Sequence, residues 1–236
     1  MKGNINSIET MGAVDGPGLR IVFFLQGCPL RCIFCHNPET WNEKENILMT
    51  PSEVLEKIIR YKNYFGTNGG VTFSGGEPLY QPEFLLEVLK LCKKNNIDTT
   101  IDTSGVNNNR GLKEEILKYT DLVIMDIKGI DVNNYKEITS KKITESLEFI
   151  DLCQKLNKKM WLRQVIVPGI NDNEEYILKL KKFIEPLKNI DKVELLPYHT
   201  LGLEKYKKLG IKYKLDKVND MDIDRCKKLE QILNNR

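Results

Sequence analysis

The stretch Gly27-Cys28-Pro29-Leu30-Arg31-Cys32-Ile33-Phe34-Cys35-His36-Asn37-Pro38 carries three cysteines at C-x3-C-x2-C spacing. It follows the apolar run 19–25, which has the composition of a buried strand. Three thiols in so short a loop can point at one common centre, as the ligands of zinc or of an iron–sulfur cluster do. The loop is therefore the candidate metal centre, and the rest of the chain is interpreted from it.

The number of cysteines in the loop bears on the group that it would bind. A structural zinc site is closed by four ligands, and a two-cluster ferredoxin run has a fourth cysteine followed by proline. A cubane cluster has four irons, so three thiolates would leave one iron open to a small molecule, which favours chemistry over electron carriage. A Cys3His zinc knuckle that uses His36, or three unrelated core cysteines, remain as alternatives.

The composition is that of an ordinary globular protein. Of the 236 residues, 29% are charged and 41% hydrophobic, and 36 basic against 33 acidic residues give a net charge of +3. This balance gives no case for binding of nucleic acid or of a membrane. Residues 1–12 lack the apolar centre of a secretory signal, and the run 21–25 is too short to span a bilayer. We expect a cytoplasmic protein with reduced thiols.

The other cysteines, Cys92, Cys153 and Cys226, have apolar neighbours at helical spacing. Buried and chemically inert cysteine is the favoured interpretation for all three. A second cluster is not expected, because these cysteines lie far apart in the sequence.

Strand-like and helical patterns alternate along the chain. Short apolar or β-branched runs predict strands at 19–25, 71–73, 98–101, 122–125, 160–167 and 192–196. Amphipathic patterns predict helices at 51–65, 82–95, 112–119, 143–157, 174–187 and 220–234, the first with Thr50 and Glu53 in a capping box. This alternation predicts an α/β fold with a parallel sheet. About six units fall short of the eight in a closed barrel, so we expect a partial, open (β/α)6 barrel in a single domain of residues 1–236.

Each predicted strand ends in groups that can chelate or hydrogen-bond. In chain order these are the cysteine loop, Ser74–Pro78, Asp102–Gly105, Asp126 with Lys128, Arg163, and His199. Ligands of parallel α/β folds bind beyond the carboxyl ends of the strands. These groups therefore predict one active site.

Two of these groups suggest a chemistry on their own. The paired glycines Gly75 and Gly76 let the backbone approach a ligand closely, and Glu77 offers an acceptor to a cation such as an amino group. Asp102 and Asp126 would serve as an acid–base pair or as hard oxygen ligands of a cation. Alternatively, Asp102 caps the following turn and Asp126 pairs with Lys128.

The combination of the cysteine loop with the Gly-Gly-Glu-Pro turn resembles the radical S-adenosylmethionine (SAM) superfamily. Within it, Val14–Arg20 and Cys35–Trp41 are similar to segments of the glycyl-radical-enzyme activases. The resemblance covers residues from about 8 to about 202, most of the chain. It implies a partial barrel of the radical SAM type and S-adenosyl-L-methionine at the open iron of a [4Fe-4S] cluster held by Cys28, Cys32 and Cys35.

The resemblance also implies which residues contact the cofactor: Asn37, Gly75, Gly76, Glu77, Thr103, Asp126, Lys128 and His199. A monovalent cation beside the SAM carboxylate would bind the side chains of Asp102 and Asp126 and the backbone carbonyls of Thr103 and Ile124. The family often has Thr-Asn-Gly where residues 103–105 are Thr-Ser-Gly, and a methionine expected at position 124 stands at 125.

The implied reaction is reductive cleavage of SAM to methionine and a 5′-deoxyadenosyl radical, which takes a hydrogen from a glycine of a large partner enzyme. Asp15 in its glycine-rich turn, His36 and Arg163 would contact the partner's glycine loop. Related activases often carry a cysteine-rich insert after the cluster loop, and residues 41–71 contain no cysteine. The expected partner is therefore pyruvate formate-lyase, with flavodoxin or ferredoxin as electron donor. The lysine-rich stretch 204–217 is expected to be solvated, or else a docking face for an acidic redox partner.

Two other functions fit parts of the sequence. One is a radical enzyme that acts on a small molecule or on a different glycyl-radical partner. The other is a non-catalytic zinc or iron–sulfur binding module, in which the Gly75–Glu77 turn and the polar strand ends would have no purpose.

Overall fold

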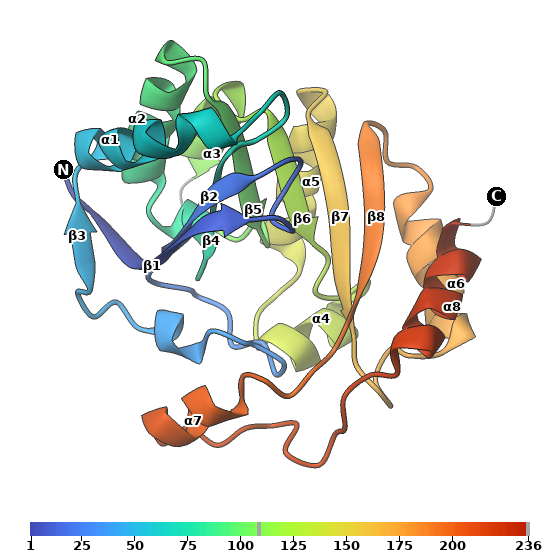
Figure 1. Ribbon diagram of the computed structural model, residues 1–236. Coiled ribbons are helices and arrows are strands. Elements are labelled where there is room, and N and C mark those ends of the chain that lie inside the picture. Colours follow the sequence, from blue (N-terminus) through green and yellow to red (C-terminus); the bar gives the residue numbers. More distant parts are fainter. Residues whose placement is uncertain (108–109, 235–236) are drawn as a thin grey trace.

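The computed structural model describes residues 1–107 and 110–234. The strands are β1 (Gly3–Gly12), β2 (Arg20–Leu25), β3 (Ile47–Met49), β4 (Gly70–Gly75), β5 (Asp98–Thr103), β6 (Leu122–Asp126), β7 (Lys159–Ile166) and β8 (Ile190–Pro197). The α-helices are α1 (Pro51–Tyr61), α2 (Pro82–Lys94), α3 (Arg110–Lys118), α4 (Val132–Thr139), α5 (Thr144–Lys155), α6 (Glu174–Ile184), α7 (Leu203–Leu209) and α8 (Ile223–Asn234). Short 3-10 turns lie at η1 (Pro38–Trp41), η2 (Lys62–Tyr64) and η3 (Pro78–Tyr80) (Figure 1).

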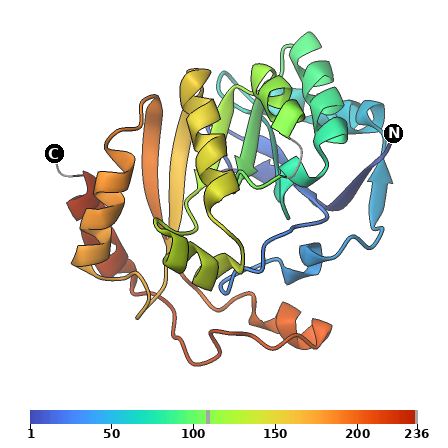
Figure 2. The same ribbon diagram turned by 180° about the vertical axis from the view of Figure 1, so that it is seen from behind.

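Across the described residues the strands form one eight-stranded sheet in the order β3-β1-β2-β4-β5-β6-β7-β8. From β2 to β8 each strand runs parallel to its neighbour, whereas β1 pairs antiparallel with β2 and with β3. The sheet curves, and its edges β3 and β8 stay apart (Figures 1 and 2). The fold is thus a partial, open α/β barrel, as the sequence predicts.

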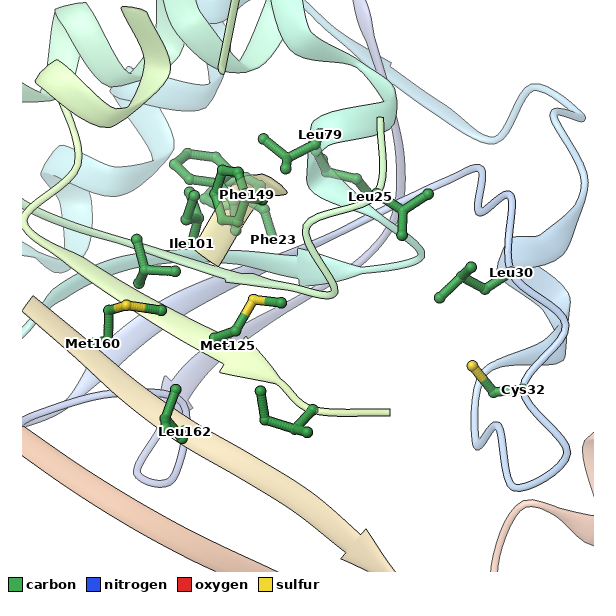
Figure 3. Packing of buried hydrophobic residues seen from close by; sticks show 14 of the residues in the cluster. Phe23, Leu25, Leu30, Cys32, Leu79, Ile101, Met125, Phe149, Met160 and Leu162 are labelled. Carbon is green, nitrogen blue, oxygen red and sulfur yellow. The ribbon is translucent and has the colours of Figure 1, made fainter. Parts of the chain in front are cut away.

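The core lies between this sheet and the helices that cover its outer face. Phe23, Ile101 and Met125 from the strands pack with Phe149 of α5, and all four are fully buried (Figure 3). The prediction that Cys92, Cys153 and Cys226 belong to the core is confirmed, since none is more than 3% exposed. Strands that are buried on both faces consist of nearly continuous apolar residues, so their positions can be predicted from the sequence.

The predicted start of α1 is confirmed in detail. Thr50 accepts a hydrogen bond from the backbone N–H of Glu53, and the Glu53 carboxylate accepts one from the backbone N–H of Thr50. This capping box satisfies two amides that the first helical turn leaves unpaired. The predicted end at residue 65 is wrong, because the chain tightens into η2 after Tyr61.

Strands β1 and β3 and helices α4 and α7 are absent from the prediction. β1 is rich in Asn, Ser and Thr, and its more and less exposed positions alternate, as in a sheet with one solvated face. Asp131 caps the N-terminus of α4, where its side chain accepts from the N–H groups of Asn133 and Asn134. α7 occupies part of the lysine-rich stretch 204–217, for which the sequence predicts a solvated surface or a docking face but no helix. In the part of the chain that the structure describes, no helix is long and apolar enough to cross a membrane.

Candidate active site

A single cavity at the carboxyl ends of the strands gathers most of the residues that the sequence singles out. It is lined by Cys28, Cys32, Cys35, His36, Asn37, Gly75, Gly76, Asp102, Thr103, Asp126 and Lys128. Phe34, Trp41 and Val165 add apolar surface, and Ser74 and Ser104 add hydroxyls that the sequence analysis did not assign. The predicted convergence of the strand ends on one site is therefore observed.

The cysteine loop is held against α4 by backbone hydrogen bonds. The backbone N–H of Arg31 donates to the carbonyl of Thr139, and that of Ile33 donates to the carbonyl of Ile138, each at 2.9 Å. Leu30 and Phe34, at 1% and 5% exposure, anchor the loop in the core. The Cys32 side chain points from the loop toward the strands (Figure 3).

Burial raises the pKa of all three loop thiols, to about 12 for Cys32. Thiols in such surroundings stay protonated at neutral pH, so thiolates form there only when bound metal cations offset the cost of burial. The donor set fits an iron–sulfur cluster in this respect, because its irons provide that positive charge.

The geometry does not favour a mononuclear zinc site. Among the described residues, no three His, Cys, Asp or Glu side chains converge on a single ion. In a cubane cluster each thiolate binds a different iron, so this convergence is not required. The ring of His36 is also engaged elsewhere: its Nε2 lies 3.0 Å from the carbonyl oxygen of His199, and it stacks on the His199 ring at 4.0 Å.

The Gly75–Gly76 turn clamps the start of the cysteine loop. The backbone N–H of Gly76 donates to the carbonyl of Leu25, and that of Glu77 donates to the carbonyl of Gly27. Gly75 has a φ of +103°, and a Cβ on Gly76 would lie 2.2 Å from the carbonyl oxygen of Gly27. Both glycines are therefore required by the close approach of two backbones.

Glu77 lies behind the wall of the cavity. Its carboxylate is 1% exposed and does not line the cavity. It accepts hydrogen bonds from the hydroxyl of Thr103 at 2.5 Å, from the N–H of Ser104 at 2.9 Å and from the N–H of Leu79 at 3.1 Å. Glu77 thus fixes the turn after β5, and the glycines of its motif line the cavity.

Asp102 and Asp126 both line the cavity, but their carboxylates have different partners. Asp126 Oδ2 pairs with Lys128 Nζ at 2.6 Å, which is the alternative that the sequence left open. Asp102 Oδ2 accepts from the Ser74 hydroxyl at 2.8 Å, while Oδ1 is buried without a partner in the described structure. Burial, followed by repulsion from Asp126, raises the pKa of Asp102 to about 7. Ile124 is fully buried in β6, in register with Asp102.

The segment after β8 packs against the end of the cysteine loop. Lys205 Nζ contacts Asn37 Oδ1 at 2.8 Å and Glu39 Oε1 at 2.6 Å, and the Tyr206 hydroxyl donates to the carbonyl of Cys35. Sequence analysis missed Lys205 and Tyr206, because a lysine run gives no sign that one of its members is turned inward. His199 borders the cavity through its stacking on His36, and its Nδ1 is buried without a partner among the described residues.

Asp15 and Arg163 do not line the cavity. The Asp15 carbonyl accepts from the Thr72 hydroxyl at 2.6 Å, and Arg163 donates to the carbonyl of Val14 and, at 3.1 Å, to Glu194. The glycine-rich turn, which precedes β2, thus contacts β4 through Thr72 and β7 through Arg163.

The sequence model of the Radical SAM superfamily matches residues 22–180, which include the cysteines, the glycine turn and both carboxylates. The fold and the site are therefore those of a radical SAM enzyme. The chain is 52% identical over 98% of its length to the "Pyruvate formate-lyase-activating enzyme" of Clostridium pasteurianum, covering 97% of that protein. It is 44% identical over 99% of its length to a protein of the same name from Staphylococcus epidermidis, covering 96% of it. The chain belongs to the radical SAM superfamily and, within it, to the family of pyruvate formate-lyase-activating enzymes.

A solved structure supports the fold independently. Streptococcus suis SuiB, in a crystal structure bound to precursor peptide SuiA, superposes with a TM-score of 0.68 at 19% identity. The likeness covers 89% of this chain and 44% of that one. At this identity the likeness concerns the fold alone.

Proposed function

We propose that the protein generates the glycyl radical of pyruvate formate-lyase by means of a [4Fe-4S] cluster and SAM. The observation that carries the proposal is the cavity in which three cysteines face the Gly75–Gly76 turn, two carboxylates and Lys128. When bound, the cluster and SAM supply reductive cleavage of the sulfonium and a 5′-deoxyadenosyl radical for hydrogen abstraction. Its relatives, which share up to about half of its residues, are named for the activation of pyruvate formate-lyase.

Different residues of the cavity hold the cluster and the different parts of SAM. Cys28, Cys32 and Cys35 bind the cluster, and the backbone at Gly75 and Gly76 receives the amino group of SAM. Lys128 stays protonated, since Asp126 raises its pKa against the effect of burial, and it neutralises a carboxylate. Asn37 and Thr103 in the cavity wall, and His199 stacked on His36 beside it, offer hydrogen bonds around the nucleoside, while Phe34 and Trp41 exclude water.

A monovalent cation completes the proposed site. The side chains of Asp102 and Asp126 bind it together with the backbone carbonyls of Thr103 and Ile124. Support comes from Asp102 Oδ1, a buried acceptor that lacks a partner among the described residues. The neighbouring carboxylates of Asp102 and Asp126 repel one another, and a cation bound by both would offset this repulsion.

The partner's glycine loop is proposed to enter along the open side of the barrel. His36 lies in the wall of the cavity, and Asp15 and Arg163 flank the glycine-rich turn. The 236 residues act as one radical SAM domain, since a single sheet runs through them. Flavodoxin or ferredoxin donates the electron, and the cytoplasm is the proposed location, because all six cysteines are free thiols.

The test is anaerobic activation. The protein is reconstituted with iron and sulfide, reduced, and mixed with SAM and pyruvate formate-lyase. We expect about four irons per chain, methionine release and the doublet glycyl signal by electron spin resonance. A signal with a different glycyl-radical enzyme but none with pyruvate formate-lyase would reassign the partner. Absence of SAM cleavage in a cluster-loaded protein would overturn the proposed activity.

A further inference from the structure

The outer side of the cysteine loop faces two adjoining surface cavities. One, of about 270 Å³, is lined by Arg31, Cys32, Trp41 and Tyr206 among others. The other, of about 600 Å³, includes Pro29 and the apolar side chains Val106, Val132 and Ile143. Ser140 lines both, so the two cavities meet at the end of α4. Figures 1 and 2 show the loop between α4 and the α7 segment, and we call this surface the outer loop face.

Cys32 separates the outer loop face from the active site. It lines the inner cavity together with Cys28 and Cys35, and it also lines the outer cavity beside Arg31. A cluster ligand thus lies in the wall that the two spaces share. Electron tunnelling weakens steeply with distance, so a redox group docked on this face is placed for transfer through that wall.

The outer loop face is strongly basic. Its exposed basic side chains are Arg31, Lys136, Lys141, Lys142, Lys212 and Lys214. Against these six, Glu145 is the one carboxylate among the described lining residues, which gives a charge of +5. The whole chain carries only +3, so the remainder is net negative. The positive charge is therefore concentrated beside the loop.

Part of this charge is held in place. Arg31 donates to the carbonyls of Cys28 and Leu30 at 2.8 and 2.7 Å, and its guanidinium lies over the Trp41 ring at 5.2 Å. An apolar floor inside a charged rim is the anatomy of a protein–protein interface. Clustered charge of one sign raises the rate of encounter with a partner of opposite sign and orients it.

We infer that the outer loop face is the docking site of a small acidic one-electron carrier protein. The inference rests on the proposed function, in which each SAM cleavage consumes one electron. The carrier loses that electron on docking and the cluster accepts it, after which the oxidised carrier dissociates. The partner's glycine loop approaches the inner cavity from the other side of Cys32, so both proteins can be bound at once.

The test compares binding and electron delivery in charge-reversal variants. The first variant combines Lys141→Glu with Lys212→Glu, so that one changed residue lines each of the two cavities. A second variant combines Lys136→Glu with Lys142→Glu. The control combines Lys227→Glu with Lys228→Glu on α8, which makes the same charge change on exposed residues of another face. Affinity for oxidised flavodoxin is measured by calorimetry at low and high salt. Cluster reduction is then followed with reduced flavodoxin and, separately, with photoreduced deazaflavin, a small reductant that needs no docking surface.

We expect both face variants to bind flavodoxin roughly 10-fold more weakly or worse and to lose most of the salt dependence of binding. Reduction by deazaflavin should be unchanged, and the α8 control should match the wild type throughout. Unchanged flavodoxin affinity, or equal loss with both reductants, would overturn the docking assignment. The docking assignment would also be overturned if the face variants lost binding to pyruvate formate-lyase but kept binding to flavodoxin. Failure of the wild type to cleave SAM with deazaflavin would instead refute the proposed function.

Discussion

The hydroxyl of Tyr206 donates a 3.0 Å hydrogen bond to the backbone carbonyl of Cys35, 171 positions earlier in the chain. The rings of Tyr206 and Trp41 also pack edge to face with their centroids 5.7 Å apart, and the neighbouring Lys205 contacts Asn37. The segment after β8 therefore holds the last thiol of the cysteine loop in position. Residues far from the motif thus contribute to the order of the cluster site.

Tyr206→Phe should weaken the contact between the segment after β8 and the cysteine loop without leaving a cavity in the core. The ring still packs, but the Cys35 carbonyl loses its donor, a loss of about 1 kcal/mol. We expect a cluster that assembles normally but releases iron to a chelator several-fold faster than the wild type. Tyr64→Phe, at an exposed position, is the matched control. Equal release rates in both variants would show that the hydrogen bond does not support the loop.

Glu77→Gln distinguishes a positioning role from direct contact with SAM. The partners of the Glu77 carboxylate are all donors, so an amide NH2 in its place would face N–H and O–H groups. We expect a loss of about 2–3 kcal/mol in the free energy of unfolding, measured by denaturant titration without SAM. A residue that serves only to bind SAM would leave that stability unchanged, and this result would support the direct contact instead.

The parts of the site that the sequence predicts are those that short-range patterns encode. The cysteine spacing, the Gly75–Gly76 turn and the strand that precedes each of them are local, and parallel pairing brings the strand ends together. The buried position of the Glu77 carboxylate is not encoded locally. It depends on hydrogen-bond donors of Thr103 and Ser104, which lie at the end of the next strand. A sequence shows that a carboxylate follows a glycine turn, but not which way it faces.

The missed elements have a common cause. β1, α4 and α7 are poor in apolar residues, and each is stabilised by contacts with distant segments. Tyr206 is 3% exposed although lysines surround it in the sequence, because it packs on Trp41 and Tyr213. Tertiary packing overrides local pattern in such segments. Lysine-rich composition therefore predicted the solvated side of α7 and missed its inner side.

Asp102→Asn should remove a pH dependence of stability. The pKa of Asp102 is raised to about 7 in the folded chain from an ordinary value of 3.8. The folded state then holds its proton more tightly than the unfolded state does. Its contribution to stability is complete below pH 3.8 and is lost as pH rises through 7. The melting temperature of the cofactor-free wild type, relative to the variant, should fall from about pH 4 to about pH 7 and level off above that.

The same variant tests the proposed cation. In buffers whose only cation is bulky and organic, addition of sodium or potassium at about pH 8 should raise the melting temperature of the wild type, because the ion offsets the buried charge. Asp102→Asn should respond weakly. Parallel melting curves for the two proteins at all pH values, with and without the ion, would remove Asp102 from the cation site.

The cysteines provide the sharpest contrast, because buried thiols of similar exposure are assigned opposite roles. Cys32 is 8% exposed and Cys92 is 0% exposed, so alanine at either position removes a packed sulfur and costs about 1–2 kcal/mol. Burial raises both pKa values to about 12, so titration alone does not separate them. Cys32 lines the active-site cavity beside Cys28 and Cys35, whereas Cys92 packs in α2 against the sheet. Cys32→Ala should therefore lose cluster iron and SAM cleavage together, while Cys92→Ala keeps both. A Cys32→Ala protein that retains a full cluster and cleaves SAM at the wild-type rate would refute the assignment of the loop.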